Sequence, residues 1–313
     1  MKGILKAIKS LDPGLLKPFE ALAAPPFAPK RSSDAPLIIL LATPRSGSTY
    51  CYQAMCHRFD INYFSNAVYM GARYPFMSTR FARRWCSPYV SDFKSDYGFV
   101  AGLNGPAEAN DIWGEWFDQH LVEVVPAPEE KRLTRALNYF DWLWGGTGKP
   151  FVTGWVGHIL YAEQMASLFP NAVFVNLERA TQDVATSLIR ARRHADQDFG
   201  QWFSTRSRDC LGEPSCDPFH DVVKQVVSLQ SRATEFVQAT GDRVFRLNYE
   251  DLCRDPEHEM SRLSRFCRER GIELNPRTDT PEIAGHERSA RIDDDYRQVQ
   301  EAITNLTGDE DEG

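Results

Sequence analysis

Three apolar segments, each followed by a helical pattern, organise the chain. The first, Leu37 to Leu41, is continuously apolar, which is typical of a central strand in a parallel sheet covered on both faces. Apolar segments from Ala172 to Leu177 and from Val244 to Leu247 predict two further strands. Strands that alternate with helices predict an α/β fold, a doubly wound parallel sheet flanked by helices.

Polar and small residues after these strands mark the predicted helices. Pro44 ends the first strand, and a helix is predicted to begin close to Gly47. Thr181 is placed to cap a second helix, which runs through Ser187 to Arg193. The third helix carries an apolar face made of Met260, Leu263 and Phe266.

One α/β domain is expected over residues 36–305, with a different kind of segment at each end. Residues 1–35 combine an amphipathic, lysine-rich helical pattern with a connector that contains Pro and Ser. We expect that helix to pack on the domain, with weak contact to an anionic membrane surface as the alternative. Residues 306–313 are acidic and are expected to form a disordered tail.

Residues 63–148 are rich in Trp and Phe but show no clean periodicity. We therefore expect a long irregular insert that covers the ligand edge of the sheet. Its aromatic side chains suit either an acceptor pocket or ordinary core packing.

Net charge and cysteine content limit the kinds of ligand and the compartment that we expect for this protein. The net charge of −7 disfavours a nucleic-acid-binding protein, so an anionic ligand must meet a local positive patch. Seven cysteines without a CxxC pair or a signal peptide predict reduced thiols and a cytoplasmic location. No apolar run approaches the roughly 20 residues of a membrane span. Composition leaves the oligomeric state open.

The stretch "PLIILLATPRSGSTY" joins the first strand to its helix through a polar turn. A turn of this kind presents unpaired N–H groups and the positive end of the helix dipole. The turn also carries hydroxyl groups, an arginine with a forked set of donors, and a glycine that lets the backbone approach a ligand closely. Together with the N–H groups, these features predict a phosphate site. The residues concerned are Arg45, Ser46, Gly47, Ser48 and Thr49.

The Walker A motif, GxxxxGK[ST], is the nearest general pattern, but the loop departs from it. Alignment on Gly47 and Thr49 places Ala42 at the first glycine and Ser48 at the lysine. Without that lysine the loop is poorly suited to hydrolysis of ATP or GTP. A turn that only caps a helix would explain one hydroxyl, but not the whole set together with Arg45.

The stretch "TPRSGSTY" resembles the 5′-phosphosulfate loop of sulfotransferases that use 3′-phosphoadenosine-5′-phosphosulfate (PAPS), with its pattern T-x-[RK]-[ST]-G-[ST]-T. A second signature of that family, an arginine after a strand and a serine eight positions later, is matched by Arg179 and Ser187. Further segments resemble those of bacterial-type sulfotransferases in the same order: "GPAEANDIWGEWF", "GKPFVTGWVGH", "LFPNAVFVNLER", "FGQWFS" and "RLNYEDLCRDP".

This resemblance extends from about Pro36 to Cys267 and implies a P-loop-like fold. It implies that residues 45–49 surround the 5′-phosphosulfate and that Arg179 and Ser187 hold the 3′-phosphate. The implied reaction moves a sulfuryl group from PAPS to a hydroxyl or amine of a small-molecule, lipid or saccharide acceptor and leaves the product PAP. Arg45 would also stabilise charge on the departing phosphate, and no carboxylate cluster for a metal is apparent.

A general base must accept the proton of the acceptor. Glu108 lies in "PAEANDIW", where related sequences often carry an acidic residue, and His158 ends "GWVGH", one short helix before the strand that leads to Arg179. These two are the main candidates for the base. Other candidates are Asp111, Glu115 and His120.

The chain departs from the family where many relatives carry a lysine after a short apolar strand. Gly154 and Trp155 stand there, and Lys149 precedes the strand. A non-catalytic protein that binds PAP or PAPS is therefore one alternative, and a variant P-loop nucleotide kinase is a weaker one. Arg288 and Arg291 are candidates for a late basic segment at the phosphates, as against ordinary charged surface.

Overall fold

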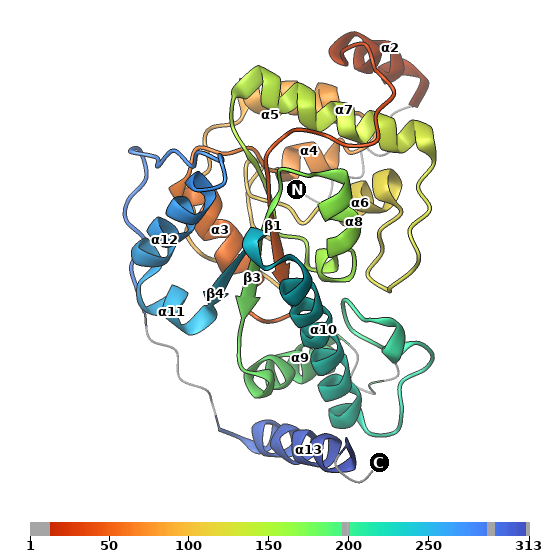
Figure 1. Cartoon of the computed structure of the whole chain (residues 1–313), viewed down its shortest axis with the longest axis vertical. Coiled ribbons are helices and arrows are strands. Elements are labelled where there is room, and N and C mark those ends of the chain that lie inside the picture. Colours follow the sequence, from red (N-terminus) through yellow and green to blue (C-terminus); the bar gives the residue numbers. More distant parts are fainter. Residues whose placement is uncertain (1–12, 196–198, 200, 287–291, 311–313) are drawn as a thin grey trace.

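The structure is a computed structural model and describes residues 13–195, 199, 201–286 and 292–310. Its centre is a four-stranded parallel sheet in the order β2-β1-β3-β4 (Figure 1). The three predicted strands are confirmed, and a short fourth strand, β2, flanks β1. The strands are β1 (Leu37–Ala42), β2 (Phe151–Thr153), β3 (Val173–Glu178) and β4 (Val244–Asn248).

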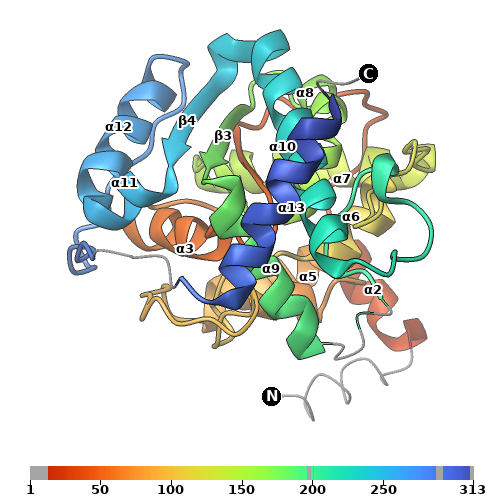
Figure 2. The ribbon, with the colours of Figure 1, turned by 90° about the horizontal axis from the view of Figure 1, so that it is seen from below.

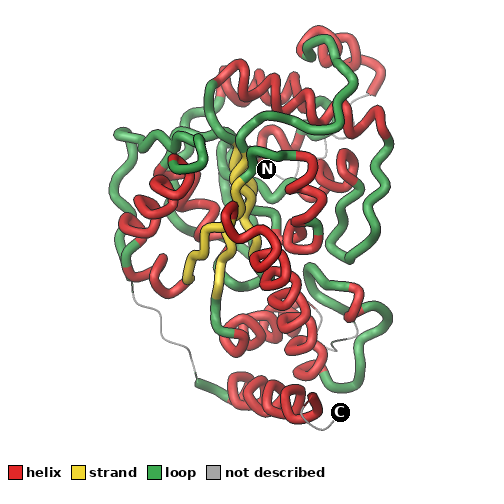
Figure 3. The backbone as a smooth tube through the Cα atoms, viewed as in Figure 1, coloured by secondary structure: helices red, strands yellow, loops and turns green. Residues whose placement is uncertain are grey.

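Helices cover both faces of this sheet, as Figure 3 shows. The α-helices are α2 (Pro13–Ala23), α3 (Ser48–Arg58), α4 (Asn66–Met70), α5 (Pro75–Trp85), α6 (Asn110–Phe117), α7 (Glu130–Thr147), α8 (Ala162–Leu168), α9 (Thr181–Ala195), α10 (Pro218–Thr240), α11 (Tyr249–Arg254), α12 (Pro256–Arg268) and α13 (Asp294–Glu310). Short 3-10 helices are η1 (Val156–Leu160), η2 (Arg208–Cys210) and η3 (Gly241–Arg243).

Strand β1 explains why its sequence is continuously apolar. Ile38 and Leu40 belong to a core shared with α3 and α12, which includes Leu263. Leu37 and Ile39 belong to a second core on the opposite face. Because side chains alternate along a strand, burial on both faces leaves no position for a polar residue.

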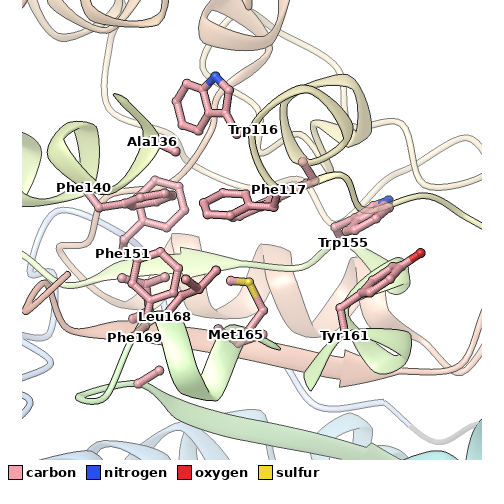
Figure 4. Close-up of a cluster of buried hydrophobic side chains, with 14 of the residues drawn as sticks. Trp116, Phe117, Ala136, Phe140, Phe151, Trp155, Tyr161, Met165, Leu168 and Phe169 are labelled. Carbon is pink, nitrogen blue, oxygen red and sulfur yellow. The ribbon is translucent and has the colours of Figure 1, made fainter. Parts of the chain in front are cut away.

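The second core is largely aromatic (Figure 4). It is built largely from α6, α7, η1 and α8 packed against the sheet, and it includes aromatic residues of the predicted insert and of the segment after β2. The sequence left open whether they form a ligand wall or the core, and burial assigns these four to the core: Trp113, Trp116, Phe117 and Trp155.

The long segment over the ligand edge is less irregular than the sequence predicted. It contains α4, α5, α6 and α7, and within it residues 86–109 lack regular helix or strand. The prediction of an irregular insert was therefore wrong where these four helices lie and holds for the remaining residues. On α5, for example, apolar residues stand on the exposed side (Phe81 and Trp85) as well as on the buried side (Phe76), which obscures the period of 3.6 residues.

The ends of the chain pack as helices. The predicted amphipathic helix falls mainly in residues 1–12, outside the described residues, while α2 packs on α5 (Figure 1). Helix α13 buries Val299 and Ala302 against α9 and α10 and continues to Glu310. Residues 306–310 are thus helical instead of forming a disordered tail, because the helix is anchored by its apolar face.

The described part of the chain contains no helix that is both long enough and apolar enough to span a bilayer.

Candidate functional site

The polar loop lies at the carboxyl end of β1 and leads directly into α3. Its backbone is left-handed at Arg45, with φ of 68°, and at Gly47, with φ of 98°. The amide and the hydroxyl of Ser46 both donate to the carbonyl oxygen of Thr43, at 3.2 and 2.8 Å. These bonds fold the loop back on itself, and the first turn of α3 offers N–H groups that have no partner within the helix.

Gly47 is in close contact with Tyr249, the first residue of α11. A Cβ added to Gly47 would lie 2.0 Å from Cε2 of Tyr249, which is far inside van der Waals contact. The glycine therefore satisfies two requirements, a positive φ and an approach of the loop to an aromatic ring.

Gly47→Ala is expected to destabilise the fold by about 2 kcal/mol or more, because the new side chain is strained and displaces Tyr249. Urea unfolding of the purified variant measures this free energy. Gly145→Ala is the matched control, since Gly145 lies in α7 with no atom within 4 Å of an added Cβ, and there alanine should be neutral or stabilising. Equal stability of Gly47→Ala and the native chain would contradict this account of the loop.

A second group of polar residues lies beside the loop because β3 is the neighbour of β1 in the sheet. Arg179 follows β3 and donates from Nη1 to the carbonyl oxygen of Arg45 at 3.1 Å. Arg45 donates from Nε to Oγ of Ser187, on α9, at 3.3 Å. The two motifs, which are far apart in sequence, are thus connected by direct hydrogen bonds.

Tyr249 also supports this second group. Its ring lies 4.5 Å from Cζ of Arg179, in the range of a cation–π contact. The same ring therefore packs on Gly47 and on the guanidinium of Arg179. It fixes the separation between the loop and that arginine.

The electrostatics of the site favour an anion. Burial lowers the pKa of Arg45 below its ordinary value, and the charge of Arg179 acts in the same direction, while Tyr97 opposes it. Among the described residues, no carboxylate lies within ion-pair distance of Arg45. Nε of Arg179 is buried without a hydrogen bond and is 3.7 Å from a carboxylate oxygen of Glu250. Two partly buried, adjacent cations are stabilised by a bound anion.

A tight turn in residues 96–99 reaches over the loop. Asp96 and Phe99 exchange two backbone hydrogen bonds of 2.9 Å, and Tyr97 and Gly98 between them both have positive φ. The ring of Tyr97 lies 5.1 Å from Cζ of Arg45 and stacks on His194 of α9. The turn therefore bridges the loop and α9.

Glu108 lies on the other side of this turn. Its Oε1 and the hydroxyl of Thr49 are 3.0 and 3.9 Å from the position of a Cβ on Gly98, so the two oxygens face the same small space. Glu108 is partly buried, and burial raises the pKa of its carboxyl group to about 7. It lines a pocket of 230 Å³ together with Tyr97 and Phe99.

The structure does not bring His158 to the loop. The side chain is fully buried between Trp113 and Trp155, and its Nε2 lies 3.0 Å from the hydroxyl of Thr153. Burial lowers the pKa of His158 to about 3, so the ring is neutral. In this packing it has no access to an acceptor, which argues against its predicted part in catalysis.

The other acidic and histidine candidates lie at exposed positions. Asp111 accepts a hydrogen bond of 3.2 Å from the hydroxyl of Tyr69. His120 pairs with Asp118 at 3.1 Å, and Glu115 is exposed on α6. Of the candidates for the base, Glu108 therefore has the geometry and the environment that best suit the role.

The position of the missing lysine is filled by another side chain. A Cβ on Gly154 would lie 2.5 Å from ring atoms of Tyr52, so no larger side chain fits there. Lys149 forms an ion pair of 2.6 Å with Asp60, before the start of β2. Since the loop follows the carboxyl end of the neighbouring parallel strand, Lys149 does not replace the missing residue.

Two residues of the site, Tyr97 and Tyr249, were not singled out from the sequence. Tyr249 directly follows β4, and a large side chain just after a parallel strand was the available signal. Tyr97 stands in the dipeptide Tyr-Gly of a tight turn, a weaker signal. Arg288 and Arg291 lie outside the described residues. Among those that are described, no group of three or more His, Cys, Asp or Glu side chains is placed to hold a metal ion.

Comparisons with known proteins agree with the resemblance. The sulfotransferase family profile matches residues 36–274, while a search of curated proteins finds no match. Together with the parallel sheet and its helices, the family match confirms the predicted P-loop-like α/β fold.

Solved structures similar to this chain are sulfotransferases of low sequence identity. STF9 from Mycobacterium avium is 13% identical, with a TM-score of 0.46 over 93% of this chain and 72% of that one. STF1 from Mycobacterium tuberculosis H37Rv is 13% identical, with a TM-score of 0.42 over 92% and 73%. The sulfotransferase domain of the Synechococcus PCC 7002 olefin synthase is 13% identical, with a TM-score of 0.41 over 80% and 78%.

Proposed function

This chain belongs to the sulfotransferase family, and from that premise we propose that it transfers a sulfuryl group from PAPS to a hydroxyl or amine of a small-molecule, lipid or saccharide acceptor. The observation that carries the proposal is the pair of hydrogen bonds from Arg179 to Arg45 and from Arg45 to Ser187. They join two cationic groups into one site. A ligand with two separate phosphate positions is the natural occupant of such a site.

The residues of the site divide between the two ends of the donor. The loop from Arg45 to Thr49 would hold the 5′-phosphosulfate through its N–H groups, hydroxyls and guanidinium. Arg179 and Ser187 would hold the 3′-phosphate, and the buried Nε of Arg179, which lacks a hydrogen bond, fits that assignment. When bound, PAPS supplies the sulfuryl group.

Glu108 would then act on the acceptor and Arg45 on the departing phosphate. The acceptor oxygen or nitrogen forms a bond to sulfur, the bond from sulfur to the 5′-phosphate oxygen breaks, and the acceptor proton passes to the Glu108 carboxylate. Arg45 stabilises the charge that appears on the departing phosphate. The pocket beside Glu108, with its aromatic wall, is the proposed acceptor site.

A non-catalytic PAP-binding protein is the second candidate. It is favoured by the absence of a lysine at Gly154, where Tyr52 leaves no room for a longer side chain. Both candidates bind PAP, and only the first consumes PAPS.

Thermal unfolding with PAP, with AMP and with ATP plus Mg²⁺ tests the donor site. A ligand at a hundredfold excess over its Kd stabilises the native chain by about 2.7 kcal/mol, and we expect the largest shift with PAP. Arg179→Ala should weaken PAP binding roughly 30-fold through loss of a charge-assisted contact. The same change should leave AMP binding almost unaltered, because AMP lacks the 3′-phosphate.

Arg132→Ala is the matched control, since Arg132 is exposed on α7 and pairs locally with Glu129. Equal losses for PAP and AMP in Arg179→Ala would mean that Arg179 only supports the loop. A shift with ATP and Mg²⁺ alone would support a nucleotide kinase instead. Consumption of labelled PAPS then separates the enzyme from the non-catalytic protein.

A further inference from the structure

Helices α2 and α5 expose aromatic, aliphatic and basic side chains at one end of the molecule. They contact one another and lie near each other in Figure 2. Trp85 is 68% exposed, Phe81 52%, Leu22 84% and Phe19 61%. We call this surface the α2–α5 face, and its members are Lys17, Phe19, Leu22, Arg80, Phe81, Arg83, Arg84 and Trp85.

The spacing of these residues on α5 is that of a second apolar stripe. Phe81 and Trp85 are four positions apart and therefore lie on one side of the helix. Phe76 and Thr79, on another side, are already buried against the core. Core packing thus explains one side of α5 and leaves the exposed pair without a structural role.

The charge of this region is opposite to that of the chain. Residues 69–91 contain four arginines and no acidic residue, although the net charge of the protein is −7. The arginines are Arg73, Arg80, Arg83 and Arg84. In the described part of the chain, neither Arg73, Arg83 nor Arg84 forms an ion pair, and the guanidinium of Arg84 lies 4.8 Å from the Trp85 ring.

The one carboxylate on α2 or α5, Glu20, does not neutralise this face. It is 7% exposed and accepts hydrogen bonds from the amides of Phe76 and Met77 at the start of α5, and from Arg135. The Glu20 carboxylate therefore caps α5 and pairs with the partly buried Arg135. The outer surface keeps a positive charge among exposed apolar rings.

We propose that the α2–α5 face binds the surface of a membrane that contains anionic lipids. Tryptophan and phenylalanine favour the headgroup boundary, and arginines beside them attract anionic headgroups. The face lies at the opposite end of the sheet from α9 (Figure 1), so binding leaves the site at the carboxyl ends of the strands open to solution. This proposal is independent of the proposed reaction.

Co-sedimentation of the full chain with vesicles tests the proposal. We expect binding to vesicles of phosphatidylcholine with about 30% phosphatidylglycerol, little binding to phosphatidylcholine alone, and weaker binding at high salt. Arg83→Glu with Arg84→Glu should reduce the partition coefficient by about tenfold or more. Phe81→Ser with Trp85→Ser should also reduce it, at unchanged charge.

Arg265→Glu with Arg268→Glu is the matched control, because these arginines are also exposed on a helix, α12, but that helix has no exposed large apolar side chain. This control should bind vesicles almost like the native chain. Unchanged thermal unfolding of each variant shows that it is folded. Absence of binding to anionic vesicles, or equal loss in the α12 control, would overturn the proposal. A second result would also overturn it: the native chain forms a concentration-dependent dimer and does not bind vesicles, and Phe81→Ser with Trp85→Ser abolishes the dimer. The α2–α5 face would then be an interface between two copies of the chain.

Discussion

Glu108→Gln is expected to lower the rate of sulfuryl transfer by about a hundredfold or more, because the amide cannot accept the acceptor's proton. PAP binding should persist, since Glu108 lies beside the loop and not among its cationic groups. Burial raises the pKa of this carboxyl group to about 7, and a base acts in its ionised form. The native rate should therefore rise with pH through about 7. Initial rates with labelled PAPS across this range measure the effect.

The direction in which Glu108→Gln changes the stability of the fold distinguishes a catalytic role of Glu108 from a structural role. A carboxyl group with a raised pKa in the folded state stabilises the fold at low pH, and this contribution is lost as pH rises toward the folded pKa. At pH above that value, Glu108→Gln should raise the melting temperature while it removes activity. Glu130→Gln, at the exposed start of α7, should change neither. A Glu108→Gln protein that keeps full activity would exclude Glu108 as the base.

Arg45→Ala is expected to reduce transfer by about a thousandfold or more, since one cation is lost from both donor binding and stabilisation of the departing phosphate. Turnover of labelled PAPS at saturating concentration measures the catalytic part, and calorimetric titration with PAP measures the binding part. Arg45→Lys retains the charge but not the fork, so it should recover part of the binding and little of the rate.

The balance between these two measurements distinguishes the two candidate functions. Loss of rate well beyond the loss of PAP affinity supports a catalytic role for Arg45. Loss of PAP affinity without any measurable turnover in the native chain would instead support the non-catalytic binding protein.

The residues of the proposed donor site could be picked out from the sequence because each motif is local. A loop after a strand carries Arg45, and a strand followed by a helix carries Arg179 and Ser187, so each motif is visible within a few residues. Their hydrogen bonds to one another follow from the pairing of β1 with β3. The parallel fold was likewise predictable from apolar strands that alternate with helices.

Burial decided what the sequence could not. Glu108 and His158 both stood in suitable motifs, but one borders a pocket and the other is enclosed by two tryptophan rings. The parts played by Tyr97 and Tyr249 depend on contacts between distant segments, which no local pattern reports. The same holds for Gly154, whose small size is explained by the ring of Tyr52.

The pairing of the two cationic groups would have a consequence for the end of each cycle of the proposed reaction. In the proposal, Arg179 and Ser187 bind a phosphate that the reaction leaves unchanged, and the loop would still bind the other phosphate after transfer. A product that retains both phosphates would leave slowly and compete with fresh donor. Steady turnover would then depend on a second enzyme, a phosphatase. By removing one of the two phosphates, it would lower the affinity of this chain for the nucleotide product.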